Sequence, residues 1–448
     1  MDVPVRPDST FLMGDLAAFK RNSLAFWIST GRQAPIVRIR FGSLTRYVIS
    51  DADFAQHILQ KNRLNYIKDQ RLMRILEAGS GRVLVTSDGD EWFWRRRLMQ
   101  PMFNRSQIAH FADTIIAETE RHLSKWQPGA TLDMDGEMKT LTMHIIGRTM
   151  FNVDFQKESG ELHHAYVTVG DSIVKRANQV FRWPLWLPTE DNRAFLRASD
   201  TIHEALETII RDRQNNPEPR RDLLEMLRAA RSEESSHKLT DEQVIHEMAA
   251  LVFAGHETTA TTLTWLLYVL SQYPEVAEKL RDELARVLDG RTPTMADIEN
   301  LPYMQQVIDE TMRLYPALYL VSRQAVAADR FGDYQLPAGE RALINLLAIH
   351  RNPRYWDDPD SFSPERFDPG RRKQQHECAL MPFMAGPRKC IGGPLAMAEL
   401  QLILPTIVQR FDLRLPQGAV VEPEAAVVLR PKGGLNMTVH PRRTPGAH

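Results

Sequence analysis

The middle of the chain places apolar residues at helical spacing. From about residue 105 to residue 315 this spacing predicts a long succession of α-helices. Polar stretches at 214–221 and 232–237 interrupt the pattern and predict loops between helices. We therefore expect most of the chain to be helical.

Alternating patterns appear on both sides of this helical region. Residues 36–49 alternate apolar and polar side chains around a Gly42-Ser43 turn, which predicts a β-hairpin. A second β-rich segment spans 324–347, and short β-like runs with Pro and Gly turns follow residue 411. The whole pattern predicts a mainly α fold with small β-sheets (α+β). Length alone would suggest about three domains. Because no linker or repeat divides the chain, we expect residues 1–448 to form one domain.

The clearest predicted helix begins near residue 240. Thr240 followed by Gln243 has the capping-box pattern, and Pro274 should end the helix after about 32 residues, or about 48 Å. The helix is apolar around most of its circumference and is therefore expected to be buried. Gly255 in its middle costs about 1 kcal/mol relative to alanine, which favours a close approach of something flat. Threonines that bond their own helix carbonyls are the alternative explanation of this segment.

Composition and charge narrow the class of protein. The chain is 43% hydrophobic and 25% charged, as globular proteins are. Its net charge of −1 gives no reason to expect nucleic acid or an anionic membrane as a partner. Two cysteines are too few for a disulfide framework and indicate a reducing, cytoplasmic compartment. His256 and Glu257 break the longest apolar stretch, and the N-terminus is not a signal peptide, so we expect a soluble monomer without a membrane anchor.

One cysteine lies in a specialised loop. Gly386 and Gly392 bracket Cys390, and an apolar helical segment follows at 395–411. The N–H groups at the start of that helix should point toward the sulfur and lower the pKa of the thiol. A lone cysteine is more often a small buried apolar residue, but this loop is too specialised for that. A zinc site made from Cys390 with His376 and Cys378 would lack a fourth ligand and the usual short spacing.

Four motifs together resemble one family. The pattern F-x-x-G-x-R-x-C-x-G at 383–392 resembles the haem-ligand loop of the cytochrome P450 superfamily, the haem-thiolate monooxygenases. Residues 310–313 resemble its E-x-x-R, residues 364–367 its P-E-R-F, and residues 254–259 its A-G-x-E-T-T, in the order that the family requires. Without a membrane anchor or a proline-rich hinge, the chain resembles a soluble bacterial-type member.

The resemblance implies a haem b (iron protoporphyrin IX) cofactor and a role for each matching residue. An axial thiolate favours cleavage of the O–O bond. Buried propionates require hydrogen bonds or counter-charges. The implied positions are Cys390 as the iron ligand; Trp92, Arg96, Arg323 and Arg388 at the propionates; Ala254 and Phe383 beside the haem; Glu257 and Thr258 as the acid and alcohol that relay protons; and Glu310, Arg313 and Arg366 as a structural charge network.

The implied reaction is monooxygenation. Dioxygen and two externally supplied electrons would place one oxygen atom, by hydroxylation or epoxidation, on a hydrophobic molecule such as a fatty acid, terpenoid or steroid. A peroxide-driven peroxygenase and a non-catalytic haem-thiolate sensor are the rival functions. By family position the substrate pocket would include residues 72–83, part of 167–181, residues 317–321 and residues 433–435. Its named members would be Ala250, Phe253, Ala317, Leu318, Val321 and Leu435. Except for Phe253, each of these is equally compatible with ordinary core.

We expect no electron donor to be fused to this haem domain. No G-x-G-x-x-G motif for a flavin or nicotinamide is present, so a ferredoxin or flavodoxin with its reductase is expected as the partner. Basic residues at 371–373, with Lys389, Arg95 and Arg97, would dock such an acidic protein. Hydrolases are excluded, because neither His246-Glu247 nor His256-Glu257 continues as H-E-x-x-H and no G-x-S-x-G occurs.

Overall fold

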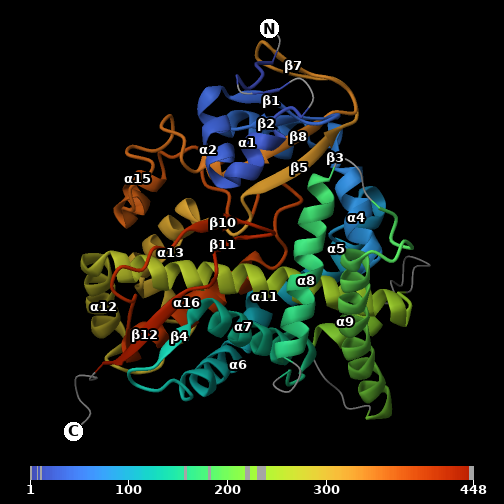
Figure 1. The fold of residues 1–448 in the computed structure, drawn as a ribbon. Helices are drawn as coiled ribbons and strands as arrows, with labels where there is room; N and C mark the ends of the chain where they lie inside the picture. The colour runs from blue at the N-terminus through green and yellow to red at the C-terminus, as the bar shows by residue number, and fades with distance from the viewer. Residues whose placement is uncertain are drawn as a thin grey trace.

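The computed structural model describes residues 3–7, 9–10, 13–155, 159–179, 183–216, 222–229 and 239–442. Within them α11 (Asp241–Gln272) crosses the middle of the molecule (Figure 1). Thr240 and Gln243 form the predicted capping box, and the helix has the predicted 32 residues. The predicted interruption at 232–237, and residues 217–221 of the other one, lie outside the described residues.

A five-stranded sheet lies toward the N-terminal end of the molecule, at the top of Figure 1. It is formed, in spatial order, by β1 (Ile36–Phe41), β2 (Leu44–Ile49), β8 (Arg341–Asn345), β5 (Leu320–Ala325) and β3 (Tyr66–Lys68). Strands β2 and β8 are parallel, whereas the other neighbours are antiparallel. The predicted hairpin at 36–49 is therefore confirmed as β1 and β2.

The remaining strands make three small sheets, in agreement with the predicted β patterns. They pair as β6 (Asp329–Phe331) with β7 (Tyr334–Leu336), as β10 (Pro423–Ala425) with β11 (Leu429–Pro431), and as β4 (Thr131–Asp133), β12 (Asn436–Pro441) and β9 (Phe411–Arg414) in that order. The predicted segment 324–347 differs at both ends: β5 starts at Leu320, and Leu346–Ile349 forms the short helix α14.

The helical part packs around α11. Its neighbours share one apolar core with it, from which the fold draws most of its buried apolar area. They are α6 (Arg105–Leu123), α7 (Met134–Phe151), α8 (Ser159–Asn178), α9 (Glu190–Asn215), α10 (Leu223–Ala229), α12 (Pro274–Leu288), α13 (Pro302–Leu314) and α16 (Gly393–Arg410). The mainly α fold with small sheets is confirmed.

Shorter helices complete the described chain. They are α1 (Leu16–Arg21), α2 (Ser23–Gln33), α3 (Ala52–Gln56), α4 (Gln70–Ser80), α5 (Gly89–Met99) and α15 (Pro369–Arg372), with single turns η1 (His57–Lys61), η2 (Arg63–Asn65), η3 (Gln100–Phe103), η4 (Ile298–Asn300) and η5 (Pro364–Phe367). None of the helices among the described residues combines the length and the hydropathy needed to span a bilayer.

Candidate active site

The loop before α16 holds Cys390 by backbone contacts. The N–H of Cys390 donates to the carbonyl oxygen of Phe383 at 2.9 Å, and the N–H of Lys389 donates to that of Gly386 at 3.1 Å. Gly386 has a φ of 74°, and a Cβ there would lie 2.1 Å from the carbonyl oxygen of Leu59. Only glycine fits this position. The loop therefore fixes the cysteine through a close backbone approach that the glycine makes possible.

The two cysteines differ in their surroundings. Cys378 is buried within the apolar cluster below the five-stranded sheet, and burial raises the pKa of its thiol to about 12. The side chain of Cys390 is accessible to solvent, but the surrounding protein still desolvates its sulfur and raises the pKa of the thiol. The N–H groups of Gly392 and Gly393 and the charge of Arg96 lower that pKa in part. The prediction that its thiol pKa falls below the ordinary value is wrong for the protein alone, because burial outweighs the helix terminus.

Helix α11 carries the predicted acid and alcohol. Glu257 is buried, and burial raises the pKa of its carboxyl, although the positive charges of Lys139 and Arg430 lower it in part. The hydroxyl of Thr258 donates to the carbonyl oxygen of Ala254 at 2.7 Å. Ala254 is exposed although it lies in the middle of this long, mostly buried helix. The helix thus presents accessible surface at its centre.

Gly255 lies where α11 packs on α7. A Cβ on Gly255 would lie 2.8 Å from the terminal methyl of Ile146 on α7. The missing side chain therefore permits close packing of α11 on α7, and no flat group is needed to explain it. The predicted close approach of a cofactor at this glycine stays a prediction.

Four predicted propionate residues gather near Cys390 from three elements. Trp92 and Arg96 lie on α5, Arg323 on β5, and Arg388 in the cysteine loop. The guanidinium of Arg388 lies 5.6 Å from the centre of the Trp92 ring. Arg96 donates to the carbonyl oxygen of Lys389 at 2.6 Å. These residues are brought together as the sequence analysis expects.

Few negatively charged groups lie close to Arg323 and Arg96. Arg323 is 9% exposed and donates to the carbonyl oxygen of Ser322 at 2.9 Å. Burial, followed by the charge of Arg388, lowers the pKa of Arg323 to about 10. Among the described residues no carboxylate forms an ion pair with the buried Arg323 or with the half-buried Arg96, and these cations fit an anionic group. Together with an accessible thiol and an exposed alanine on α11, this donor set fits haem with its two carboxylates.

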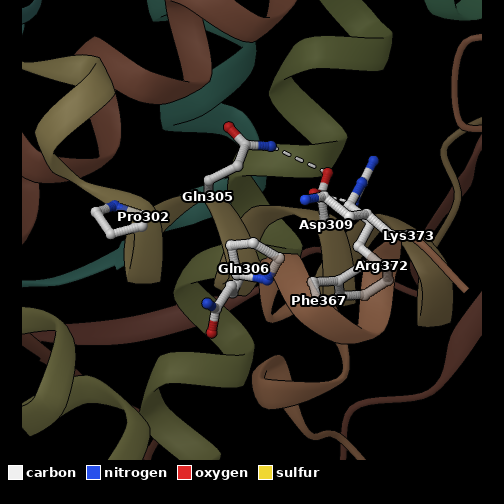
Figure 2. A pocket seen from close by; sticks show the side chains of 8 residues that line it. Pro302, Gln305, Gln306, Asp309, Phe367, Arg372 and Lys373 are labelled. Carbon is white, nitrogen blue, oxygen red and sulfur yellow. Dashed lines mark hydrogen bonds and ion pairs between the residues drawn. The ribbon is translucent and has the colours of Figure 1, made fainter.

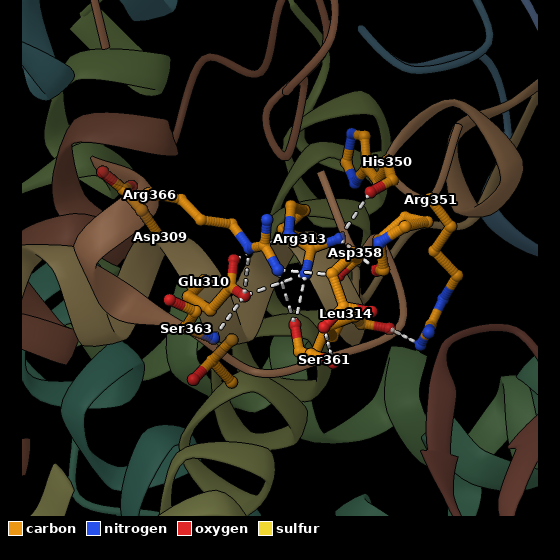
Figure 3. A network of polar contacts seen from close by, with 12 residues as sticks. Asp309, Glu310, Arg313, Leu314, His350, Arg351, Asp358, Ser361, Ser363 and Arg366 are labelled. Carbon is orange, nitrogen blue, oxygen red and sulfur yellow. Dashed lines mark hydrogen bonds and ion pairs between the residues drawn. The ribbon is translucent and has the colours of Figure 1, made fainter. Parts of the chain in front are cut away.

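Glu310, Arg313 and Arg366 form one buried network (Figure 3). Arg313 donates to both carboxylate oxygens of Glu310, and Arg366 donates to the same carboxylate at 3.2 Å. Arg313 also donates to the carbonyl oxygens of His350, Pro359 and Ser361 at 2.6 to 3.0 Å. The two arginines thereby fix α13 to η5 and to the chain before it.

The predicted pocket residues differ in their surroundings. The ring centres of Phe253 and Tyr166 lie 6.1 Å apart. A Cβ added to Gly170 would lie 3.1 to 3.4 Å from side-chain atoms of Phe253 and Val427. Leu435 is 1% exposed in the main core, and its N–H donates to Asp133 at 2.8 Å.

Val427, in the turn between β10 and β11, is thus a C-terminal residue close to Phe253, and the placement of Leu435 in the pocket stays a prediction. No motif marked Val427, because its position near Phe253 depends on the turn that carries it.

The other predicted pocket residues differ in exposure. Ala250 and Ala317 are half-buried, Leu318 is 39% exposed and Val321 is buried. Residues 180–181 of the 167–181 segment lie outside the described residues.

Arg95 is not on the surface. Its side chain is 2% exposed, and it pairs with Glu247 on α11 and with Glu91 one turn earlier on α5. The expectation that Arg95 belongs to a solvated, partner-docking face is wrong, because its side chain turns inward to a buried carboxylate. Arg97 and Lys389 are exposed as expected.

Lys68 lies at the site although no sequence motif marks it. It lies on β3 opposite Arg323 on β5, and its ammonium donates to the carbonyl oxygens of Leu84 and Ser87 at 2.8 and 2.7 Å. Burial, partly offset by Asp88, lowers the pKa of Lys68 to about 7. A single lysine in a short strand gives no pattern in the sequence, so only the pairing of β3 with β5 identifies it.

The chain resembles known proteins over nearly its whole length. The family model described as Cytochrome P450 matches residues 6–438. The chain is 33% identical to Cyclooctat-9-en-7-ol 5-monooxygenase of Streptomyces melanosporofaciens over 91% of this chain and 89% of that protein. It is 31% identical to Leukotriene-B4 omega-hydroxylase 3 of Mus musculus, over 89% and 80%. The solved heme domain of cytochrome P450DA shares the fold, with a TM-score of 0.90, 23% identity and 99% of both chains covered.

Proposed function

The chain belongs to the cytochrome P450 family, and from that membership we propose that it is a haem-thiolate monooxygenase in which Cys390 holds the iron of haem b. The observation that carries this assignment is the position of Cys390. It lies in a glycine-dependent loop close to Arg96, and neither Arg96 nor the buried Arg323 has a carboxylate partner in the described part of the chain. Haem held by the Cys390 thiolate would supply the electron transfer and O–O cleavage of this reaction.

The residues around that site would divide the remaining work. Arg96, Arg323 and Arg388, with Trp92, would bind and orient the carboxylates of the cofactor. Phe383 would pack beside the thiolate, since its carbonyl oxygen already accepts the N–H of Cys390. Glu257 and Thr258 would hold and pass protons on the α11 side, because both lie within one turn of the exposed Ala254.

A hydrophobic substrate fits the chain best. The two relatives are named for oxidation of cyclooctat-9-en-7-ol and for omega-hydroxylation of leukotriene B4. Phe253 on α11 lies close to one aromatic and one apolar side chain, those of Tyr166 and Val427. We therefore infer hydroxylation or epoxidation of a terpenoid, steroid or fatty acid.

The electron donor would be a separate acidic protein, either a ferredoxin or a flavodoxin. Arg97 and Lys389 are exposed near Cys390, and Arg371 and Lys373 are exposed on and just after α15. A groove of about 560 Å³ borders Arg372 and Lys373 and is otherwise lined by Pro302, Phe367 and their neighbours (Figure 2). The positive residues would attract the donor and orient it. Because both cysteines are free thiols, we infer that the protein works in the cytoplasm.

Spectral titration tests the proposal. Purified holoenzyme would be titrated with terpenes, steroids and fatty acids while displacement of the sixth-ligand water is followed in the Soret region. Saturable shifts with some members, followed by an oxygenated product that requires dioxygen and a reductase pair, are expected. Turnover by hydrogen peroxide alone would favour a peroxygenase, and haem binding without any turnover would favour a sensor.

A further inference from the structure

A buried ion pair joins α5 to α11. Arg95 on α5 donates to Glu247 on α11, and the two side chains are 2% and 1% exposed. Arg95 also donates to Glu91 at 3.0 Å, and Glu91 pairs with Arg82 at 2.7 Å. Helix α5 carries Trp92 and Arg96 of the proposed haem site, whereas α11 carries its acid and alcohol. The pair therefore connects the helix that carries two proposed propionate residues to the helix that carries the proposed acid and alcohol.

The same carboxylate holds the segment between α4 and α5, residues 81–88, which we name the strap. Glu247 accepts the N–H of Leu84 with both oxygens, at 3.0 and 3.2 Å. Lys68 donates to the carbonyl oxygen of Leu84 at 2.8 Å. Leu84 is thus fixed by a buried anion at its N–H and by a buried cation at its carbonyl oxygen.

The strap also lies directly on α11. Gly81 has a φ of 64°, and a Cβ there would lie 2.3 Å from Nδ1 of His246. At the other end, Asp88 caps α5 by accepting the N–H of Gly89 at 3.0 Å, and it pairs with Arg388. The strap thus runs from the surface of α11 to the arginine that lies two residues before Cys390.

Stability alone does not explain why an ion pair, rather than two apolar side chains, occupies this buried position. Two apolar side chains of similar volume usually pack as well as a buried ion pair, whereas an ion pair fixes one geometry. Arg95 makes hydrogen bonds in two directions, to Glu247 and to Glu91, which an apolar residue could not do. The arrangement fixes the rotation and position of α5 relative to α11.

We propose that Arg95 and Glu247 are positioning residues that align Trp92, Arg96 and Arg388 with the carboxylates of the haem. They act through the strap and through the start of α5, and neither residue touches the cofactor. The inference rests on the proposed function, because it requires haem beside Cys390.

The test uses holoenzyme with Arg95→Met and Glu247→Gln. Each variant should keep the thiolate-type spectrum, and the amide of Leu84 should exchange hydrogen at least ~10-fold faster than in the wild type. The propionate bending bands in the resonance Raman spectrum should shift, and haem should transfer to apomyoglobin at least ~10-fold faster. Arg105→Met is the control, since it cuts an exposed pair with Glu299 and should change none of these.

A double variant keeps the test decisive if the single variants fail to fold. Arg95→Met with Glu247→Leu leaves no charge stranded and should therefore fold. It should still show fast exchange at Leu84 and shifted propionate bands. Native exchange and native bands in this double variant, or in both single variants, would overturn the bridge. A wild-type protein without a thiolate-type spectrum would instead refute the proposed function.

Discussion

Arg313 donates hydrogen bonds to both carboxylate oxygens of Glu310, at 2.6 and 2.8 Å, and neither side chain is exposed to solvent. The same guanidinium satisfies three carbonyl oxygens of the chain before η5. Removing it would leave a buried carboxylate beside unpaired carbonyl groups, which is among the most destabilising changes available to a folded protein.

We expect Arg313→Ala to lose about 3–5 kcal/mol of folding free energy and to yield soluble apoprotein or aggregate. Lys279→Ala is the control: it cuts the half-exposed pair with Glu365 and should cost less than about 1 kcal/mol. Haem content and unfolding in denaturant measure both variants. A haem-loaded but slow Arg313→Ala enzyme would show that the network is catalytic rather than structural.

Thr258→Ala should uncouple electron use from product formation. Without the hydroxyl that faces the Ala254 turn, protons reach the site less readily, and reducing equivalents should leave as hydrogen peroxide. The ratio of peroxide to nicotinamide consumed measures this, and we expect it to rise severalfold. Thr264→Ala removes an equivalent hydroxyl that bonds the carbonyl oxygen of Ala260 two turns later. Equal coupling in the two variants would count against the relay.

The stability of the protein should depend on Glu399. Burial raises the pKa of this carboxyl on α16 to about 8, although the Thr259 hydroxyl lowers it in part. The folded state then keeps a proton that the unfolded chain, with a pKa near 4.5, releases. Stability should therefore fall as the pH rises from about 4.5 to about 8, by about 1.4 kcal/mol per unit of pKa difference at most, and level off above that.

Glu399→Gln should remove this part of the pH dependence. Its carboxamide cannot ionise, so the variant should gain on the wild type between about pH 4.5 and pH 8 in denaturant unfolding of the holoenzyme. Parallel stability curves for the two proteins would mean that Glu399 ionises normally in the fold.

Electron transfer should depend on salt. Lys389→Glu and Arg97→Glu should each slow reduction by an acidic donor, and the difference from the wild type should shrink as the ionic strength rises. Stopped-flow reduction rates at several salt concentrations measure this. Salt-insensitive reduction would remove the proposed docking face.

Local sequence signals predicted the elements with strong boundaries. The capping box at Thr240 and the proline at 274 bounded α11, and the turn at Gly42 set the register of β1 and β2. These signals act within a few residues along the chain, so they survive without knowledge of the tertiary structure.

Contacts between distant segments were not predictable in the same way. Arg95 looked like one more surface arginine because its partner, Glu247, lies 152 residues away. The packing of Gly255 against Ile146 could not be foreseen because that side chain belongs to another helix. Val427 and Lys68 gained their places from a turn and a strand pairing that no single segment specifies.

The ferrous carbon monoxide difference spectrum tests the central claim most directly. Wild type and Cys378→Ser should both show the long-wavelength Soret band of a thiolate-ligated haem, because Cys378 is buried in an apolar cluster and burial raises the pKa of its thiol to about 12. Cys390→Ser should lose that band. A thiolate band that persists in Cys390→Ser, or one that is missing from the wild type, would contradict the assignment of Cys390 as the iron ligand.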